Sequence, residues 1–488
     1  MKIGFDNDKY LSIQSEHIKE RIAKFKGKLY LELGGKLFDD HHASRVLPGF
    51  QPDSKLRMFS KISDQIEIVI VISAEDIERN KVRADLGITY DEDVLRLRDE
   101  FIGRGFMVGS VVITHYNGQH AADDFRKRLE RMGIKSYVHY LIDGYPHNVQ
   151  LIASDEGFGK NDYVVTERPL VIVTAPGPGS GKMAVCLSQL YNEHKRGIEA
   201  GYAKFETFPV WSLPLKHPVN IAYEAATADL NDVNMIDPFH LEAYGKTAIN
   251  YNRDIEIFPV LDALFEGIYG HNPYKSPTDM GVNMVGFCIS DDEVCCEASK
   301  NEIIRRYYDA TNKFANGASN EAEMQKIQLL FNQAGINTDY RKVTVAAKER
   351  KARNGGIPSA AMELEDGTII TAEASDLLGS CAALLLNAMK HLAGIDHSLK
   401  LIPQNMIEPI QKMKVEYLQG KNPRLHTDEV LVALSVLSQV NDTCVKALEK
   451  LPEFQGCQAH ATVMLSEVDR KILKKLGVGL TCDPIKKI

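Results

Sequence analysis

The chain has 488 residues, of which 44% are hydrophobic and 25% are charged, and its formal net charge is −8. At roughly 150 residues per domain, this length predicts two or three domains. The small negative charge, without a dense run of Lys and Arg, excludes a nucleic acid or an anionic membrane surface as an expected partner. No apolar run approaches the roughly 18 residues that a membrane helix needs, and the start "MKIGFDNDKY" lacks a signal-peptide core, so we expect a cytoplasmic protein.

Short apolar runs alternate with amphipathic stretches from residue 28 to residue 210. This alternation is typical of a parallel sheet with helices on both faces, and we predict a doubly wound α/β domain over residues 1–225. Residues 118–134 predict a surface helix with Phe125, Leu129 and Met132 on one stripe. The expected strands are "KLYLEL", "IEIVIVIS", "SVVITHY", "SYVHYLI", "PLVIVTA" and "FETFPVW".

The middle of the chain, residues 226–350, predicts a loop-rich and helical subdomain. Helices are expected at residues 299–314 and 320–336, and a strand is expected directly after "NYNRD". Asn252, Arg253 and Asp254 would then precede that strand as a polar cluster. The hydrophilic stretch 346–356 ends in a glycine pair, which predicts an exposed junction between domains.

Residues 351–488 predict a second α/β unit with three layers. The run "SAAMELEDGTIITAEAS" predicts a hairpin that turns at Asp366 and Gly367, and a helix that is apolar on almost all sides follows it. Residues 426–451 predict a further helix. The last three segments, "CQAHATVML", "EVDRKILKKLG" and "VGLTC", predict a strand, a helix and a strand.

A glycine-rich turn, "APGPGSGKM", stands between a predicted buried strand and a predicted helix. A phosphate loop has the pattern G-x-x-x-x-G-K-[ST], in which backbone amides and the lysine bind phosphates and the hydroxyl binds magnesium. Here Pro176 replaces the first glycine and Met183 replaces the hydroxyl. We expect Gly177, Gly179, Ser180, Gly181 and Lys182 to bind an anion, with magnesium left open. If the turn binds nothing, Lys182 is a solvated residue that opposes the helix dipole.

Two further segments contribute to the expected site. The stretch "LELGGKLFDD" places Gly34, Gly35 and Lys36 after a strand, where α/β proteins bind ligands, and we expect these residues to contact the same phosphorylated ligand. The alternative for this segment is a polar surface loop that binds nothing. Lys182, Arg253 and Asp254 are the candidate catalytic residues, since phosphoryl transfer depends mainly on positioning and charge stabilisation.

The cysteines and histidines do not predict a metal site. Eight cysteines are scattered without a CxxC pair, and several lie within apolar runs, as small buried hydrophobic residues do. Cys295 and Cys296 are adjacent, but neighbours in sequence seldom reach one ion, and no histidine follows at ligand spacing.

Taken together, "LELGGKLFDDHHASRVLPGF", "APGPGSGKMA", "NYNRDIEIFPVL", "SPTDMGVN" and "EIIRRYY" resemble bacterial members of uncharacterised protein family 0371. The resemblance covers essentially the full length and implies a cytoplasmic, multi-domain α/β protein. It does not identify any catalytic residue, because the family has no established activity. The C-terminal part separately resembles the cytidine-deaminase fold. Cys381 is followed by two alanines and no P-C-x-x-C occurs, so this second resemblance implies the topology without the zinc chemistry.

Two functions are consistent with these features. The first is an enzyme, a nucleotide-dependent transferase or ATPase, that binds ATP, another nucleotide or another phosphorylated small molecule through a degenerate phosphate loop. The second is a non-catalytic binding or assembly protein whose glycine loop is a relic. A homo-oligomer is compatible with both.

Overall fold

The computed structural model describes residues 2–34, 37–38, 40–83 and 86–484. The described chain separates into two compact units. We call Lys2–Glu224 with Asn231–Ala298 the N-terminal unit, and Ala225–Leu230 with Ser299–Ile488 the C-terminal unit. The division at residues 225 and 350 that the sequence suggests stays a prediction.

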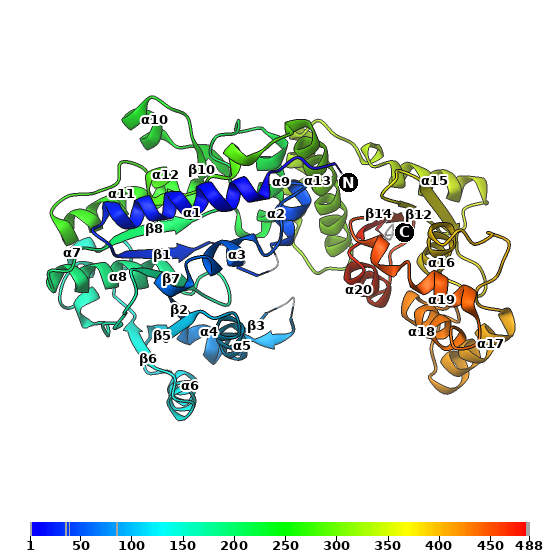
Figure 1. The fold of residues 1–488 in the computed structure, drawn as a ribbon, viewed down its shortest axis with the longest axis horizontal. Coiled ribbons are helices and arrows are strands. Elements are labelled where there is room, and N and C mark those ends of the chain that lie inside the picture. The colour runs from blue at the N-terminus through cyan, green and yellow to red at the C-terminus, as the bar shows by residue number, and fades with distance from the viewer. Residues whose placement is uncertain (1, 35–36, 39, 84–85, 485–488) are drawn as a thin grey trace. The chain divides into compact units, whose positions relative to one another are not determined.

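The N-terminal unit is built on a parallel sheet of seven strands in the order β11-β8-β1-β7-β2-β5-β6 (Figure 1). Strands alternate with helices along this part of the chain, which confirms the predicted α/β class. The strands are β1 (Leu29–Leu33), β2 (Ile66–Ser73), β5 (Met107–Tyr116), β6 (Ser136–Tyr140), β7 (Leu170–Thr174), β8 (Gly201–Phe205) and β11 (Gly281–Val282). Two short antiparallel pairs lie outside this sheet: β3 (Val82–Arg83) with β4 (Ile88–Thr89), and β9 (Asn234–Ile236) with β10 (Ile249–Tyr251).

Both faces of the sheet are apolar because successive side chains of a strand point to opposite faces. In β7, Leu170 and Ile172 join the apolar cluster on one face, whereas Val171 and Val173 join the cluster on the other. The first face is covered by α1 (Asn7–Lys24), α3 (Ser54–Ser60), α5 (Tyr90–Gly103) and α6 (His120–Arg131). The second is covered by α8 (Lys182–Lys195) and α11 (Asn252–Tyr269).

The strand order creates a topological switch point next to β7. From β2 the chain continues to β5 and β6 on one side, returns to place β7 between β1 and β2, and then continues through α8 to β8 on the other side. The connections that leave the carboxyl ends of β2 and β7 therefore diverge. In open α/β sheets, a crevice at such a point is the usual place for a ligand.

Three sequence-based expectations for this unit are wrong. The strand after α8 is Gly201–Phe205 and not "FETFPVW", where Pro209 lacks the backbone donor that a ladder needs. The segment after "NYNRD" is the helix α11 and not a strand, because its buried positions recur at helical spacing, including Ile255, Phe258 and Leu261. Met132 lies beyond the end of α6 and is exposed.

Short helices complete this unit: α2 (His41–Val46), α4 (Ala74–Glu78), α7 (Val149–Ile152), α9 (Pro218–Ala226), α10 (Pro238–Tyr244) and α12 (Pro277–Met280). Helix α9 ends within the segment Ala225–Leu230, and the long helix α13 (Asp292–Ala315) contains the division between Ala298 and Ser299.

The C-terminal unit has a four-stranded sheet in the order β13-β12-β14-β15, in which only β14 and β15 are parallel. Its strands are β12 (Ser359–Glu363), β13 (Ile369–Glu373), β14 (Gln458–Ala461) and β15 (Gly479–Cys482), so the hairpin around Asp366 and the closing strand, helix and strand are confirmed. Its helices are α14 (Glu321–Gln333), α15 (Lys342–Arg353), α16 (Ser380–Leu392), α17 (Gln404–Lys412), α18 (Thr427–Leu437), α19 (Asp442–Leu448) and α20 (Glu467–Lys475).

One expectation for the C-terminal unit is wrong, and two stay open. Most of the stretch 346–356 belongs to helix α15, whose buried Val343 and Ala347 pack with Ala361 of β12, and the domain junction expected there stays a prediction. The single helix expected at residues 426–451 is two helices, because Asn441 caps a new one. The cytidine-deaminase-type topology stays a prediction.

Arg341 attaches the start of α15 to the C-terminal sheet. Its buried guanidinium donates to Thr481 Oγ1 (2.8 Å), Gln458 Oε1 (2.9 Å) and the Gly479 carbonyl (2.8 Å). Burial lowers its pKa to about 10, which still leaves it charged at neutral pH.

We expect Arg341→Met to destabilise this sheet by about 1–3 kcal/mol, because buried acceptors lose their donors. The measurement is hydrogen–deuterium exchange of peptides from β14 and β15, which should exchange faster. Arg353→Met, whose ion pair with Glu349 is exposed, is the control and should leave exchange unchanged. Equal exchange in the two variants would contradict a role for Arg341 in stability.

Candidate functional site

The loop Ala175–Gly181, called the glycine loop below, connects the carboxyl end of β7 to the first residue of α8. Gly179 and Gly181 have φ values of 75° and 83°, in the left-handed region that favours glycine. A Cβ on Gly177 would lie 2.3 Å from the Tyr90 hydroxyl oxygen. The strand, turn and helix that the sequence predicted around this loop are confirmed.

Thr114, at the end of β5, holds the glycine loop over the carboxyl edge of the sheet. Its Oγ1 lies 2.6 Å from the Ser180 carbonyl and 3.3 Å from the Ile72 carbonyl, so it bridges the loop to the end of β2. The loop therefore extends from β7 over β2, whereas α8 leads toward β8 on the other side of β7. This places it at the topological switch point.

Several hydrogen-bond donors of the glycine loop and of the first turn of α8 have no acceptor within the part of the chain that the structure describes. These are the backbone N–H groups of residues 179–184. The Ser180 Oγ is also buried and has no hydrogen-bond partner among the residues that the structure describes. Donors at the N-terminus of a helix, together with the positive end of its dipole, favour an anion.

Lys182 begins α8 and makes no ion pair with any residue that the structure describes. It is half-buried, and its positive charge interacts electrostatically with Cys186, one turn further along α8. Burial raises the pKa of the Cys186 thiol well above its ordinary value; Glu32 raises it further, and Lys182 opposes the rise. Lys182 and the Glu32 carboxylate of β1 are thus in electrostatic range of one thiol. Met183, at the position of the magnesium-binding hydroxyl, instead packs against the apolar cluster beneath α8.

A second group of charges lies at the carboxyl end of β8, and we call Lys204, Glu206 and Asp254 the Lys204 cluster. Lys204 Nζ lies 2.9 Å from Glu206 Oε1 and also contacts Asp254, which is in the first turn of α11. Burial opposes the charge of Lys204, but Asp254, Glu206 and Glu32 outweigh it and raise its pKa. Burial raises the pKa of Glu206 to about 7, with Lys204 lowering it and Asp254 raising it.

The glycine loop and the Lys204 cluster share one edge of the sheet. Strand β1 separates β7 from β8, so their backbones are about 10 Å apart at about 4.8 Å per strand. Glu32 of β1 lies between them and accepts a hydrogen bond of 2.7 Å from Tyr202 Oη of β8. Helix α8 begins directly after the glycine loop, and Asp254 in the first turn of α11 contacts Lys204, so both helices begin near this edge.

The other predicted site residues are placed as follows. Arg253, in the first turn of α11, forms a two-point ion pair with the buried Asp232, with Nε 2.5 Å from Oδ1 and Nη2 2.9 Å from Oδ2. Gly34 follows β1 and donates its N–H to the Phe205 carbonyl at 3.1 Å, so it pins the end of β1 to β8. Gly35 and Lys36 lie outside the described residues. The catalytic and binding roles assigned from the sequence stay predictions.

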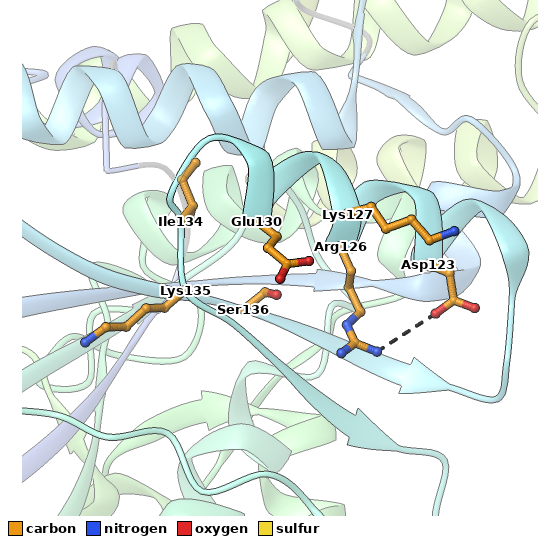
Figure 2. A pocket seen from close by; sticks show the side chains of 7 residues that line it. All are labelled: Asp123, Arg126, Lys127, Glu130, Ile134, Lys135 and Ser136. Carbon is orange, nitrogen blue, oxygen red and sulfur yellow. Dashed lines mark ion pairs between the residues drawn. The ribbon is translucent and has the colours of Figure 1, made fainter.

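A cavity of about 450 Å³ on the N-terminal unit is a surface depression (Figure 2). It is lined by charged side chains of α6 and of the turn into β6, and Arg126 pairs with Asp123 across 3.9 Å. Ser136 begins β6, so the depression lies toward the amino edge of the sheet, opposite the glycine loop. Its lining residues are Asp123, Arg126, Lys127, Glu130, Ile134, Lys135 and Ser136.

Sequence reasoning missed Glu32, Lys204 and Glu206. The available signal was a charged residue within or just after a strand whose other positions are apolar, as in "LYLEL" and "GYAKFE". Such a residue is costly to bury unless it has a partner at the end of the sheet. The partners themselves come from other strands and from α11, and no spacing along the chain indicates them.

Comparison with known proteins covers nearly the whole chain. Residues 3–335 match the N-terminal part, and residues 339–487 the C-terminal part, of the domain of unknown function DUF1846. A UPF0371 protein of Corynebacterium urealyticum is 56% identical over 99% of this chain and 97% of its own length. UPF0371 proteins of Streptococcus uberis (56%) and Streptococcus thermophilus (55%) are similar over 99% of this chain and 98% of theirs.

Among the helices that the structure describes, none is both long enough and apolar enough to span a membrane. The resemblance inferred from the sequence motifs is confirmed at high identity and over both halves of the chain. The chain therefore belongs to the UPF0371 family, whose sequence signature is the DUF1846 domain.

Proposed function

We propose that this protein is an enzyme that binds a phosphorylated small molecule, with a nucleotide as the first candidate, at the carboxyl edge of its parallel sheet. The observation that carries the proposal is the group of donors without acceptors in the glycine loop and the first turn of α8. Lys182, which begins α8, also has no acidic partner among the described residues. A phosphate group would accept these hydrogen bonds and neutralise the lysine.

The Lys204 cluster supplies the groups for a reaction next to that ligand. A carboxylate whose pKa is about 7, as for Glu206, can accept or give a proton at neutral pH. Asp254 remains a candidate catalytic residue through its contact with Lys204, whereas the guanidinium of Arg253 is already paired with Asp232. Phosphoryl transfer or an ATP-coupled reaction fits this set, because positioning and charge do most of the work in such reactions.

Isothermal titration with ATP, GTP, coenzyme A and sugar phosphates tests the proposal. We expect one of these classes to bind, and Lys182→Ala to weaken its binding by about 10- to 100-fold, the usual range for one charge-assisted contact. Ser180→Ala should also weaken binding without loss of stability, because its buried hydroxyl has no protein partner to lose in the described structure.

Lys195→Ala, at the opposite end of α8, is the matched control and should bind like the native chain. If none of the four classes binds, or if Lys182→Ala binds as tightly as the native protein, the proposal is lost. The second of these outcomes would favour the non-catalytic alternative, in which the glycine loop is a relic.

A further inference from the structure

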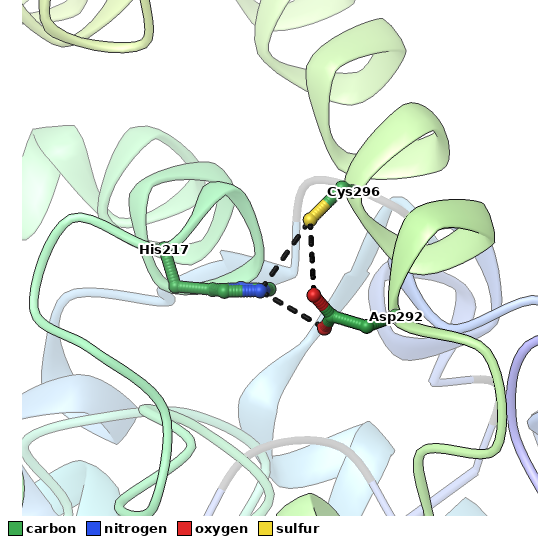
Figure 3. Close-up of side chains that lie close together, drawn as sticks. All are labelled: His217, Asp292 and Cys296. Atoms are coloured by element: carbon green, nitrogen blue, oxygen red, sulfur yellow. Dashed lines mark hydrogen bonds and ion pairs between the residues drawn. The ribbon is translucent and has the colours of Figure 1, made fainter.

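Three side chains that can bind a metal meet in the N-terminal unit, at His217, Asp292 and Cys296 (Figure 3). His217 Nε2 lies 3.0 Å from Asp292 Oδ1 and 3.4 Å from Cys296 Sγ. The Cys296 Sγ lies 3.8 Å from Asp292 Oδ2. Among the described residues, this is the one group of three or more His, Cys, Asp or Glu side chains that lie so close together.

The fold explains why these residues meet. Asp292 and Cys296 are four residues apart in α13, so their side chains share one face of the helix. The neighbouring Cys295 is buried, and its thiol donates to the Gly4 carbonyl. Of the two adjacent cysteines, Cys296 is therefore the one that contacts His217. His217 precedes α9 and is held by backbone hydrogen bonds to Pro214 and from Ile221.

One ligand atom from each of the three residues lies within 4.8 Å of the other two, which is close enough to hold one zinc ion. With Zn–N and Zn–O bonds of about 2.05 Å and a Zn–S bond of about 2.3 Å, tetrahedral angles place N and O about 3.4 Å apart and S about 3.6 Å from each. His217 Nε2 lies 3.0 Å from Asp292 Oδ1 and 3.4 Å from Cys296 Sγ, which differ from these values by about 0.4 and 0.2 Å. The 3.8 Å from Cys296 Sγ is to the other carboxylate oxygen of Asp292, Oδ2, so the carboxylate must turn to bring one oxygen to the ion. Small rotations of the side chains are sufficient to admit the ion.

We propose that His217, Asp292 and Cys296 form a zinc-binding site. Thiolate and imidazole ligands exclude the hard ions magnesium and calcium and suit zinc. A thiolate and a carboxylate also balance the two charges of the ion. Three protein ligands leave the fourth position of the tetrahedron to water, and the exposed Asp292 leaves a path for the ion from solvent.

Binding changes the tautomer of His217. In the structure, the backbone N–H of Val219 donates to His217 Nδ1, with the two nitrogens 3.3 Å apart. An imidazole that gives Nε2 to a metal carries its proton on Nδ1, so this weak hydrogen bond is lost. None of the three metal-binding residues belongs to the glycine loop or to the Lys204 cluster. The zinc affinity of this site is therefore independent of the proposed function.

The test uses the full chain with zinc and then with cobalt(II) as probes. Competition against a chromophoric chelator should show one high-affinity zinc equivalent per native chain. Cys296→Ser and Asp292→Asn should each weaken it by more than about tenfold, the scale of losing a protein ligand. Cobalt(II) in the native protein should show the charge-transfer absorption of a cobalt–thiolate bond, and Cys296→Ser should not.

Asp291→Asn is the matched control. Asp291 is the neighbouring carboxylate and accepts a hydrogen bond from Val294, which an asparagine side chain can also accept. This variant should bind zinc like the native chain. The proposal is overturned if the native protein lacks the cobalt–thiolate band, or if Asp292→Asn and Asp291→Asn bind zinc equally. Because Asp292 is exposed, its variant is expected to fold, and either result is decisive.

Discussion

Replacing Lys204 by methionine is expected to lower the free energy of unfolding of the N-terminal unit by about 3–5 kcal/mol at pH 8, the usual cost of removing one partner from a buried ion pair. The change leaves Glu206 and Asp254 without the cation that both contact. Glu32 also loses a nearby positive charge. At acid pH the two carboxyl groups can take up protons, so the loss should become smaller as the pH falls.

The single tryptophan of the chain makes this measurable. Trp211 lies in the N-terminal unit, so its fluorescence during urea unfolding reports that unit. Lys26→Met, which removes an exposed ion pair with Glu199, is the control and should change stability by less than about 1 kcal/mol. Adding Glu206→Gln to Lys204→Met should restore part of the lost stability. A loss for Lys204→Met no larger than that of the control would contradict the buried cluster.

Replacing Glu206 by glutamine is expected to remove a pH dependence of stability of the N-terminal unit. Burial raises the pKa of Glu206 to about 7 in the folded protein, above the ordinary value of 4.5. Between these two values the folded state binds more protons than the unfolded state. The stabilisation is therefore complete below about pH 4.5 and is lost as the pH rises through about 7.

The measurement is the difference in unfolding free energy between the native protein and Glu206→Gln from pH 5 to pH 8. This difference should fall as the pH rises, by at most about 1.4 kcal/mol per pH unit and by about 3 kcal/mol in total. The contributions of all groups that titrate alike in both proteins cancel in this difference. Glu199→Gln, at an exposed position, should show no such trend. A difference that is constant with pH would mean that Glu206 is ionised throughout this range.

The sequence by itself determined the α/β class and most of the sheet. Apolar runs such as "IEIVIVIS" and "PLVIVTA" can satisfy both faces of a strand only inside a parallel sheet, so β2 and β7 were predictable from local pattern. The glycine loop was predictable for the same local reason, since its pattern follows a strand and begins a helix. The family was predictable too, because its motifs are contiguous.

Only the tertiary structure decided which side chains share a site. Lys204 and Asp254 are 50 residues apart, and His217 and Cys296 are 79 apart, so no spacing rule relates them. The same structure pairs Arg253 with Asp232 and turns the expected strand after "NYNRD" into α11. Local pattern specifies which residues are buried, but the partner of a buried charge depends on strand order and helix packing, which are long-range properties of the whole fold.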